Sequence, residues 1–331
     1  MQLTLDGDVV RAGGRARERF YDSRGYGRVR DGDLDLAPVE AAHLCYRGDI
    51  DGVDGLGTRE LLSSDTVSMV EFLVYKDLRD RGFYLTPARE GWVDDPAGVD
   101  FVVYPRGKGP WDDAVAYRVR VVGERDAIPA ASLADCVLAV VDEESELTYL
   151  DTTGRTVEGT SDAAVPDASG DLLAERVLCW DPPAPLYERA FYGQRLDEDA
   201  VQLSLVEAAY LAREGSLTVD GGADAVVDRG RDVEGERFDR RLTVYSALRD
   251  AGVVPKTGFK FGADFRTYAD VESVDELGHS ELLVRVLPAT HDFEPRDLAL
   301  DVRLAHGVRK TMVFALVGDG VEWVGVERLT P

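Results

Sequence analysis

The chain has 331 residues, which is enough for two domains that each bury a hydrophobic core. Its formal net charge is −25, and five of its 38 basic residues are lysines. This acidity weighs against nucleic-acid binding, because affinity for phosphates comes from Lys and Arg. It also fits a protein that works in high salt, where screening shortens the range of charge repulsion. We favour the high-salt interpretation, so a nucleic-acid substrate is not excluded.

The sequence contains an internal repeat. Four short matches keep their order at an offset of roughly 165 to 170 residues. The paired segments are Tyr26–Gly27 and Tyr192–Gly193, Val39–Leu44 and Val206–Leu211, Val74–Asp80 and Val244–Asp250, and Asp100–Tyr104 and Asp264–Tyr268. The chain therefore consists of two related halves.

The polar stretch 151–170 has no apolar periodicity and predicts a linker between the halves. Residues 1–150 then form the first repeat and residues 171–331 the second. Each repeat divides into a small N-terminal α/β subdomain and a longer mixed-sheet subdomain. The expected subdomains are about 1–63 and 64–150 in the first repeat, and about 171–235 and 236–331 in the second.

Apolar periodicity predicts the elements of both repeats. We expect helices at 38–47, 67–81, 204–214, 238–251 and 295–306, and, in the second repeat, strands at 263–269, 280–287, 309–317 and 321–327. Gly82 and Gly252 are suited to end the helices that precede them. The order helix, strand, strand, helix, strand, strand predicts an α/β (α+β) fold in which each half carries a small mixed sheet.

Cysteine usage and hydropathy bear on where the protein works. Cys45, Cys136 and Cys179 have no regular spacing, which indicates buried thiols in a reducing compartment and argues against a disulfide frame or a zinc site. No apolar run approaches the roughly 20 residues of a membrane span, and the first residues do not resemble a signal peptide. We expect a soluble, cytoplasmic protein without a membrane partner.

Three side chains at the ends of predicted elements could act together: Tyr268, His279 and Lys310. Each has an ordinary interpretation, since a strand-end tyrosine usually packs, a single histidine is usually structural, and a strand-edge lysine is usually solvated. RNA cleavage by its own 2′-hydroxyl needs a base, an acid and a cation at the phosphate, and these three supply one each. His291 and His306 add no metal-ligand spacing, so we expect neither a metal nor a cofactor.

Three segments carry a family resemblance: Gly258–Phe265 followed by Tyr268, then His279–Ser280, then Arg303–Lys310. Together they resemble the archaeal tRNA-splicing (tRNA-intron) endonucleases, closely over the second half and through the repeat over nearly the whole chain. The resemblance implies metal-independent cleavage of precursor tRNA at a bulge-helix-bulge, leaving a 2′,3′-cyclic phosphate and a 5′-hydroxyl. It also implies a nuclease-like mixed-sheet subdomain in each half, and a homodimer of fused two-unit chains from a halophile.

The resemblance assigns roles to residues of the second half. Tyr268 becomes the general base, His279 the general acid and Lys310 the cation. Arg303 and Arg328 become the pair that holds a flipped bulge base, which guanidinium planes can do by stacking. The alternative is that they are two surface arginines.

The first half departs from the family pattern. Tyr104 occupies the place of Tyr268, but Ala114 and Ala134 stand opposite His279 and Lys310, so this half should be inactive. Its acidic run, made of Asp142, Glu143, Glu144 and Glu146, resembles a loop that family members insert into a basic pocket of a partner unit. A solvated turn is the competing interpretation.

Two other functions remain open from the sequence. A non-catalytic RNA-binding or scaffold protein of the same fold would have lost activity in both halves. A metal-dependent nuclease would cleave RNA, but no carboxylate or histidine cluster in the sequence supports it.

Overall fold

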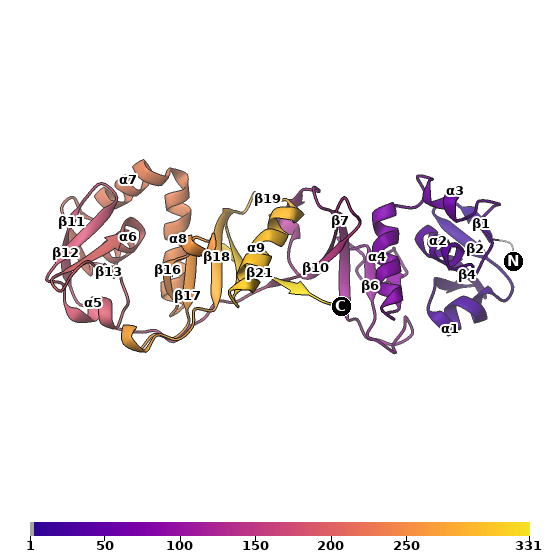
Figure 1. Cartoon of the computed structure of the whole chain (residues 1–331), viewed down its shortest axis with the longest axis horizontal. Coiled ribbons are helices and arrows are strands. Elements are labelled where there is room, and N and C mark those ends of the chain that lie inside the picture. The colour runs from indigo at the N-terminus through magenta and orange to yellow at the C-terminus, as the bar shows by residue number, and fades with distance from the viewer. Residues whose placement is uncertain (1–2) are drawn as a thin grey trace.

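The computed structural model describes residues 3–331 and is elongated, with a β-sheet at each end and one long sheet across the middle (Figure 1). The first end is a four-stranded sheet in the order β1-β2-β4-β3. Its strands and helices are β1 (Leu3–Asp6), β2 (Val9–Ala12), α1 (Asp22–Arg24), β3 (Arg28–Arg30), β4 (Asp33–Leu36), α2 (Pro38–Tyr46) and α3 (Thr58–Leu62). Phe20, Tyr26 and Leu34 are buried between this sheet and its helices.

The opposite end is a five-stranded sheet in the order β13-β14-β12-β11-β15. It is built from β11 (Ala168–Leu172), β12 (Arg176–Trp180), α5 (Ala184–Glu188), β13 (Gln194–Arg195), β14 (Ala200–Ser204), α6 (Leu205–Arg213), β15 (Leu217–Val219) and α7 (Gly222–Glu234). Residues 155–167, which lead into it, carry no helix or strand.

A ten-stranded sheet in the order β16-β17-β18-β20-β21-β10-β9-β7-β6-β5 crosses the middle of the molecule. The first half supplies β5 (Leu85–Pro87), β6 (Phe101–Val103), β7 (Tyr117–Gly123), β9 (Cys136–Val141) and β10 (Leu147–Gly154). The second half supplies β16 (Val254–Thr257), β17 (Phe265–Tyr268), β18 (Leu282–Pro288), β20 (Thr311–Val317) and β21 (Val321–Leu329). The halves meet where β10 pairs antiparallel with β21.

Each half packs one long helix on its part of the sheet: α4 (Met69–Asp80) in the first and α8 (Glu236–Asp250) in the second. Each half also makes an equivalent hydrogen bond to a strand of the central sheet. In the first half the Asp100 carboxylate accepts from the N–H of Val121 at 2.7 Å, and in the second the Asp264 carboxylate accepts from the N–H of Val286 at 2.9 Å. One of the differences between the halves is a helix. The second half carries α9 (Pro295–Gly307), where the first has only a short turn at Ala130–Ser132.

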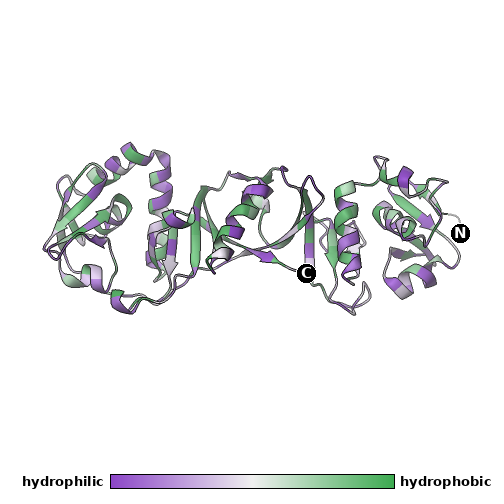
Figure 2. Ribbon diagram, viewed as in Figure 1, coloured by the Kyte–Doolittle hydropathy of each residue, from purple (hydrophilic) through white to green (hydrophobic). Residues whose placement is uncertain are grey.

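The core at the centre belongs to both halves. One buried cluster joins Leu138 and Leu150 of the first half to Phe314, Leu316 and Val324 of the second. Figure 2 shows the central strands as predominantly hydrophobic, and this buried apolar surface stabilises the junction. Two short strands, β8 (Ile128–Pro129) and β19 (Asp292–Phe293), add a second antiparallel contact between the halves.

The predicted α/β class is confirmed, and the mixed sheets expected in the two halves are continuous with each other, because β10 pairs with β21. The three cysteines are free and buried. Within residues 3–331, no helix combines the length and the hydropathy needed to cross a membrane.

Candidate active site

Tyr268, His279 and Lys310 come from three separate segments that meet at one edge of the central sheet. Tyr268 ends β17, which runs antiparallel to β18, so it lies where β18 begins. The N–H of Glu281 donates to Thr267 O at 3.1 Å, and the N–H of Thr311 donates to Glu281 O at 3.1 Å. Because β18 and β20 are parallel, the residues just before them, His279 and Lys310, share that edge. The register thus brings the three predicted residues together.

Tyr268 is almost fully buried, with 7% of its surface exposed. Its ring packs edge-on against Phe191, with centroids 5.8 Å apart, in a small cluster with Val254 and Val271. The guanidinium carbon of Arg266 lies 5.7 Å from the centre of the Tyr268 ring. The phenol is therefore fixed in place by packing from the N-terminal part of its own half.

The Lys310 amine is held by the residue that follows His279. Its Nζ donates to the Ser280 Oγ at 2.5 Å and to the Ser280 carbonyl oxygen. Partial burial, together with the positive charge of Arg266, lowers the pKa of Lys310. Ser280 is 7% exposed, so a buried residue next to His279 orients the Lys310 amine.

His279 is exposed, in the loop that leads into β18. It lines a shallow cavity of about 270 Å³ whose other lining residues include Asp270, Glu272, Glu276 and Glu281. An imidazole in this position is accessible to a large substrate and can donate a proton to a leaving oxygen.

A buried ion pair between Lys256 and Glu207 contacts Phe191, the residue that packs on Tyr268. The sequence analysis did not predict this pair. The Lys256 amine donates to Glu207 Oε1 at 2.9 Å and to the carbonyl oxygens of Phe191 and Gly193 at 3.2 and 2.7 Å. Burial acts to raise the pKa of Glu207, but the Lys256 charge and the hydrogen bonds outweigh it and lower that pKa to about 2. Lysine scarcity was the available signal, since Lys256 is one of five lysines.

This pair connects the N-terminal part of the second half to the central sheet. Lys256 lies on β16, whereas Glu207 and Phe191 belong to the end sheet and its helices. The Lys256 amine donates to the Phe191 carbonyl oxygen, and the Phe191 ring packs on Tyr268. The ion pair therefore holds Phe191 in position against the Tyr268 ring.

Strand register gives the first-half equivalents of these positions. The in-register series is Phe101, Val119 and Val137 in the first half and Phe265, Val284 and Val313 in the second. From this series, the first-half equivalent of His279 is Ala114 and that of Lys310 is Ala134, as the sequence alignment predicts. Tyr104 remains, and it donates to Thr86 Oγ1 at 3.0 Å. The first half therefore lacks the imidazole and the amine.

Arg303 and Arg328 lie on one cavity of about 760 Å³ that opens between α9 and the β10–β21 junction. Arg303 comes from α9 and Arg328 from β21, opposite Leu150 of β10. Both arginines are exposed, and Leu300 and His306 line the same hollow. The structure thus brings the two predicted arginines to a shared concave surface.

The acidic run forms the turn between β9 and β10. The Asp142 carboxylate accepts from the N–H groups of Glu144 and Glu146 at 2.9 and 2.8 Å, so it closes its own turn. Glu143 pairs with Arg125 at 2.7 Å on the surface. Glu144 and Glu146 are exposed at the tip. Three of the four predicted carboxylates therefore face solvent, while Asp142 is used internally.

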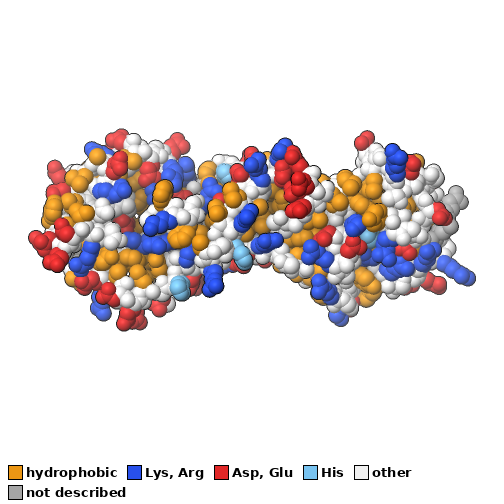
Figure 3. Space-filling view, in the orientation of Figure 1, with side chains coloured by type: hydrophobic (Ala, Val, Ile, Leu, Met, Phe, Trp, Pro, Cys, Tyr) orange, Lys and Arg blue, Asp and Glu red, His pale blue; other side chains and the backbone are white. Residues whose placement is uncertain are grey.

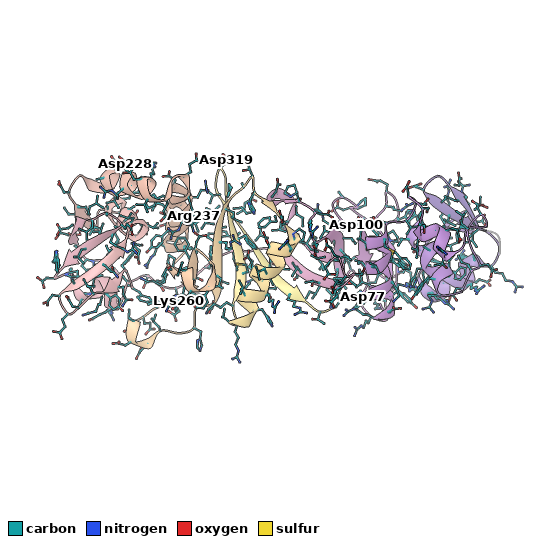
Figure 4. All side chains as sticks on the ribbon, turned by 45° about the horizontal axis from the view of Figure 1, so that its top comes forward. Asp77, Asp100, Asp228, Arg237, Lys260 and Asp319 are labelled. Carbon is teal, nitrogen blue, oxygen red and sulfur yellow. The ribbon has the colours of Figure 1, made fainter. Side chains whose placement is uncertain are left out.

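Across residues 3–331, no group of three or more His, Cys, Asp and Glu side chains is arranged to hold a metal ion. Figure 4 labels Lys260, which lies between β16 and β17 of the second half, and Asp77 and Asp100, which lie in the first half toward the other end of the molecule. Figure 3 shows acidic and basic side chains interspersed over the visible face, without a single basic stripe.

Comparison with known proteins defines the class as tRNA intron endonucleases. Residues 238–323 match the model of the tRNA intron endonuclease catalytic C-terminal domain, and residues 1–62 and 168–229 match the model of the N-terminal domain. The sequence is 77% and 61% identical, over the full length of both chains, to tRNA-splicing endonucleases of Haloarcula marismortui and Haloferax volcanii. It is 38% identical, over 99% of each chain, to that of Methanosarcina acetivorans.

The chain therefore belongs to the tRNA-splicing endonuclease family and is an enzyme that cleaves tRNA introns. This confirms the resemblance drawn from the sequence. The relatives from haloarchaea also explain the acidic composition, which is typical of proteins that work in concentrated salt.

Proposed function

We propose that the enzyme cleaves precursor tRNA at a bulge-helix-bulge without using a metal ion. The 2′-oxygen of the nucleotide before the cut attacks its own phosphorus while Tyr268 takes the 2′ proton. The bond from phosphorus to the 5′-oxygen breaks, and His279 gives that oxygen a proton. Lys310 stabilises the extra negative charge on the five-coordinate phosphate. The products are a 2′,3′-cyclic phosphate and a 5′-hydroxyl.

The observation that carries this mechanism is that the strand register puts Tyr268, His279 and Lys310, from three separate segments, at one sheet edge. The fixed position of Tyr268, with its ring packed on Phe191, and of Lys310, held by Ser280, supports it, because preorganised groups need little rearrangement during the reaction. The exposed loop that carries His279 leaves the imidazole accessible to RNA.

We assign Arg303 and Arg328 to the RNA. Two guanidiniums on a shared hollow of about 760 Å³ can hold an unpaired base between their planes. We further assign residues 1–150 to a non-catalytic repeat and 171–331 to the catalytic one, because the register leaves alanines where the acid and the amine would stand.

The active form is proposed to be a homodimer, with the acidic turn as one of its contacts. Support comes from the exposed carboxylates of Glu143, Glu144 and Glu146 at the tip of the turn. A second observation is that Leu300, Leu304 and Val308 are 51%, 48% and 40% exposed along one side of α9. Such a stripe is unusual on so acidic a chain, and a second copy would cover it.

The test is to incubate the protein with a bulge-helix-bulge RNA in excess EDTA and concentrated KCl and to identify the new ends. Cyclic-phosphate and 5′-hydroxyl ends are expected. Loss of cleavage on adding EDTA would show that a metal is required, and intact RNA in all conditions would contradict the catalytic assignment. The molecular mass in the same buffer, measured by light scattering, tests the homodimer.

A further inference from the structure

Arg266 lies within electrostatic reach of two of the proposed catalytic groups. It is two residues before Tyr268 on β17, so both side chains project from the same face of the strand. Its guanidinium carbon is 5.7 Å from the centre of the Tyr268 ring. After burial, its positive charge is the cause that lowers the pKa of Lys310. The guanidinium therefore lies near the phenol and the amine, and it lines a cavity of about 500 Å³ together with Lys256 and Glu207.

The charge of Arg266 is not neutralised by the protein. Its Nε is buried and has no hydrogen-bond partner among residues 3–331, and no carboxylate of that range forms an ion pair with it. Lys256, its partner in register on β16, is paired with Glu207. Arg79, Arg249 and Arg120 also lack a carboxylate, but each donates to a carbonyl oxygen, whereas the Arg266 side chain makes no hydrogen bond among residues 3–331. Desolvating a guanidinium is costly unless an anion or another acceptor is supplied.

Comparison of the two halves distinguishes Arg266 from the arginines that are part of the fold. Arg79 stacks on Tyr26 at 3.8 Å in the first half, and Arg249 stacks on Tyr192 at 3.8 Å in the second. This stacked arginine is present in both copies, as expected of a residue that is part of the fold.

At the place of Arg266 the first half has Val102, which is 3% exposed. The guanidinium is therefore absent from the half that also lacks the imidazole and the amine. Its absence indicates that the position serves the reaction and not the fold.

We propose that Arg266 is a further catalytic residue, which contacts one non-bridging oxygen of the scissile phosphodiester beside Lys310. The proposal rests on the RNA-cleaving function proposed above. A phosphate oxygen is the anion that the uncompensated guanidinium lacks, and a guanidinium and an ammonium together can stabilise both the ground-state charge and the additional charge of the five-coordinate phosphate.

The test uses Arg266→Met, which keeps the aliphatic packing and removes the charge, and Arg266→Lys, which keeps a charge. Arg120→Met is the matched control, because Arg120 is a half-buried arginine on β7 of the same sheet in the non-catalytic half. Single-turnover cleavage is measured in EDTA on RNAs whose scissile phosphate carries sulfur at either non-bridging position.

Arg266→Met should slow cleavage roughly 10²-fold, Arg266→Lys should recover part of the rate, and Arg120→Met should match the parent. The parent enzyme should be slowed by sulfur at the contacted oxygen, and Arg266→Met should lose that sensitivity for this one diastereomer. A residue that only supports Tyr268 would slow all substrates alike.

Equal sulfur effects in the parent and Arg266→Met would overturn the assignment, as would an unchanged rate. Dissociation of a dimer by Arg266→Met with unchanged sulfur effects would also overturn it, since the missing anion would then be a carboxylate of the partner. Failure of the parent enzyme to cleave in EDTA would instead contradict the proposed function, so the two failures are distinguishable.

Discussion

Replacing Lys256 by Met should destabilise the second half in a pH-dependent way. The substitution removes the only cation that hydrogen-bonds to Glu207 among residues 3–331 and leaves that carboxylate buried, although it still accepts from the N–H groups of Gly193 and Ser204. Breaking a buried pair from one side costs about 3 to 5 kcal/mol of unfolding free energy. The Phe191 carbonyl loses the same donor, so the support of Tyr268 should loosen and cleavage should slow as well.

The first half shows what Glu207 would become. Its equivalent is Glu40, which is also buried and also accepts from two N–H groups, those of Gly27 and Ala37. By register, Thr86 stands where Lys256 would be. Without that cation, burial raises the pKa of Glu40 to about 7 from the ordinary 4.5. We therefore expect the pKa of Glu207 to rise from about 2 toward about 7 in Lys256→Met.

The sign of the pH dependence follows from that rise. A carboxyl whose pKa is higher in the folded state contributes stability below its unfolded pKa and loses it as the pH rises through the folded pKa. The variant should therefore recover about 2 kcal/mol of its lost stability between roughly pH 7.5 and pH 5. The parent Glu207, with its pKa near 2, stays ionised throughout that window.

Urea unfolding in concentrated KCl at several pH values measures the difference between variant and parent. Lys260→Met is the matched control, because Lys260 is an exposed lysine in the loop that follows β16. Lys260→Met should change the free energy of unfolding little at any pH. A Lys256→Met destabilisation that is the same at pH 5 and pH 7.5 would refute the reasoning, because Glu207 would then not be the group left unpaired.

Other outcomes are expected from the same structure. His279→Ala and Lys310→Ala should each slow single-turnover cleavage by about 10² or more while binding of an uncleavable 2′-deoxy RNA persists; near-normal cleavage would remove that residue from the mechanism. Arg303→Ala should weaken RNA binding, and Arg303→Lys should not restore it, because an ammonium cannot stack as a plane; full rescue by lysine contradicts stacking. Raising KCl from low to molar concentration should increase the cleavage rate, opposite to the usual salt effect on RNA binding, and a rate that falls monotonically would contradict a high-salt adaptation. Glu40→Gln should flatten the loss of stability that the parent shows as the pH rises toward about 7; an unchanged slope in urea unfolding would exclude Glu40.

Elements with strong local signals could be predicted from the sequence. The helix expected at 295–306 is α9 (Pro295–Gly307), and the strand expected at 280–287 is β18 (Leu282–Pro288). Tyr268, His279 and Lys310 were predicted because one reaction needs their three chemistries, and the strand register puts them at one sheet edge. Their strands, β17, β18 and β20, are neighbours in the sheet and lie within one stretch of the second half, so the edge that they share follows largely from local order.

What could not be predicted depends on contacts between distant segments. The pairing of β10 with β21 joins Thr152 to Val326, and no local pattern distinguishes these strands from edge strands. Helix α7 was missed because it buries few apolar residues and because Gly230, an unfavourable helix residue, is required there. A Cβ at Gly230 would lie 2.2 Å from the ring of Phe238. The Lys256–Glu207 pair spans 49 residues and two sheets, so no sequence spacing reveals it.

The same long-range pairing gives a structural role to the first half, which we propose to be inactive. β10 covers the edge of β21, the strand that carries Arg328, and Leu138 and Leu150 complete the core under Phe314 of β20. Loss of the first half would expose the β21 edge and leave α9, with Arg303, on an incomplete core. The first half is thus free to lose the imidazole, the amine and the guanidinium, but not its strands. This asymmetry is what a duplicated enzyme should show when one copy supplies the chemistry and the other supplies the surface on which the chemistry is positioned.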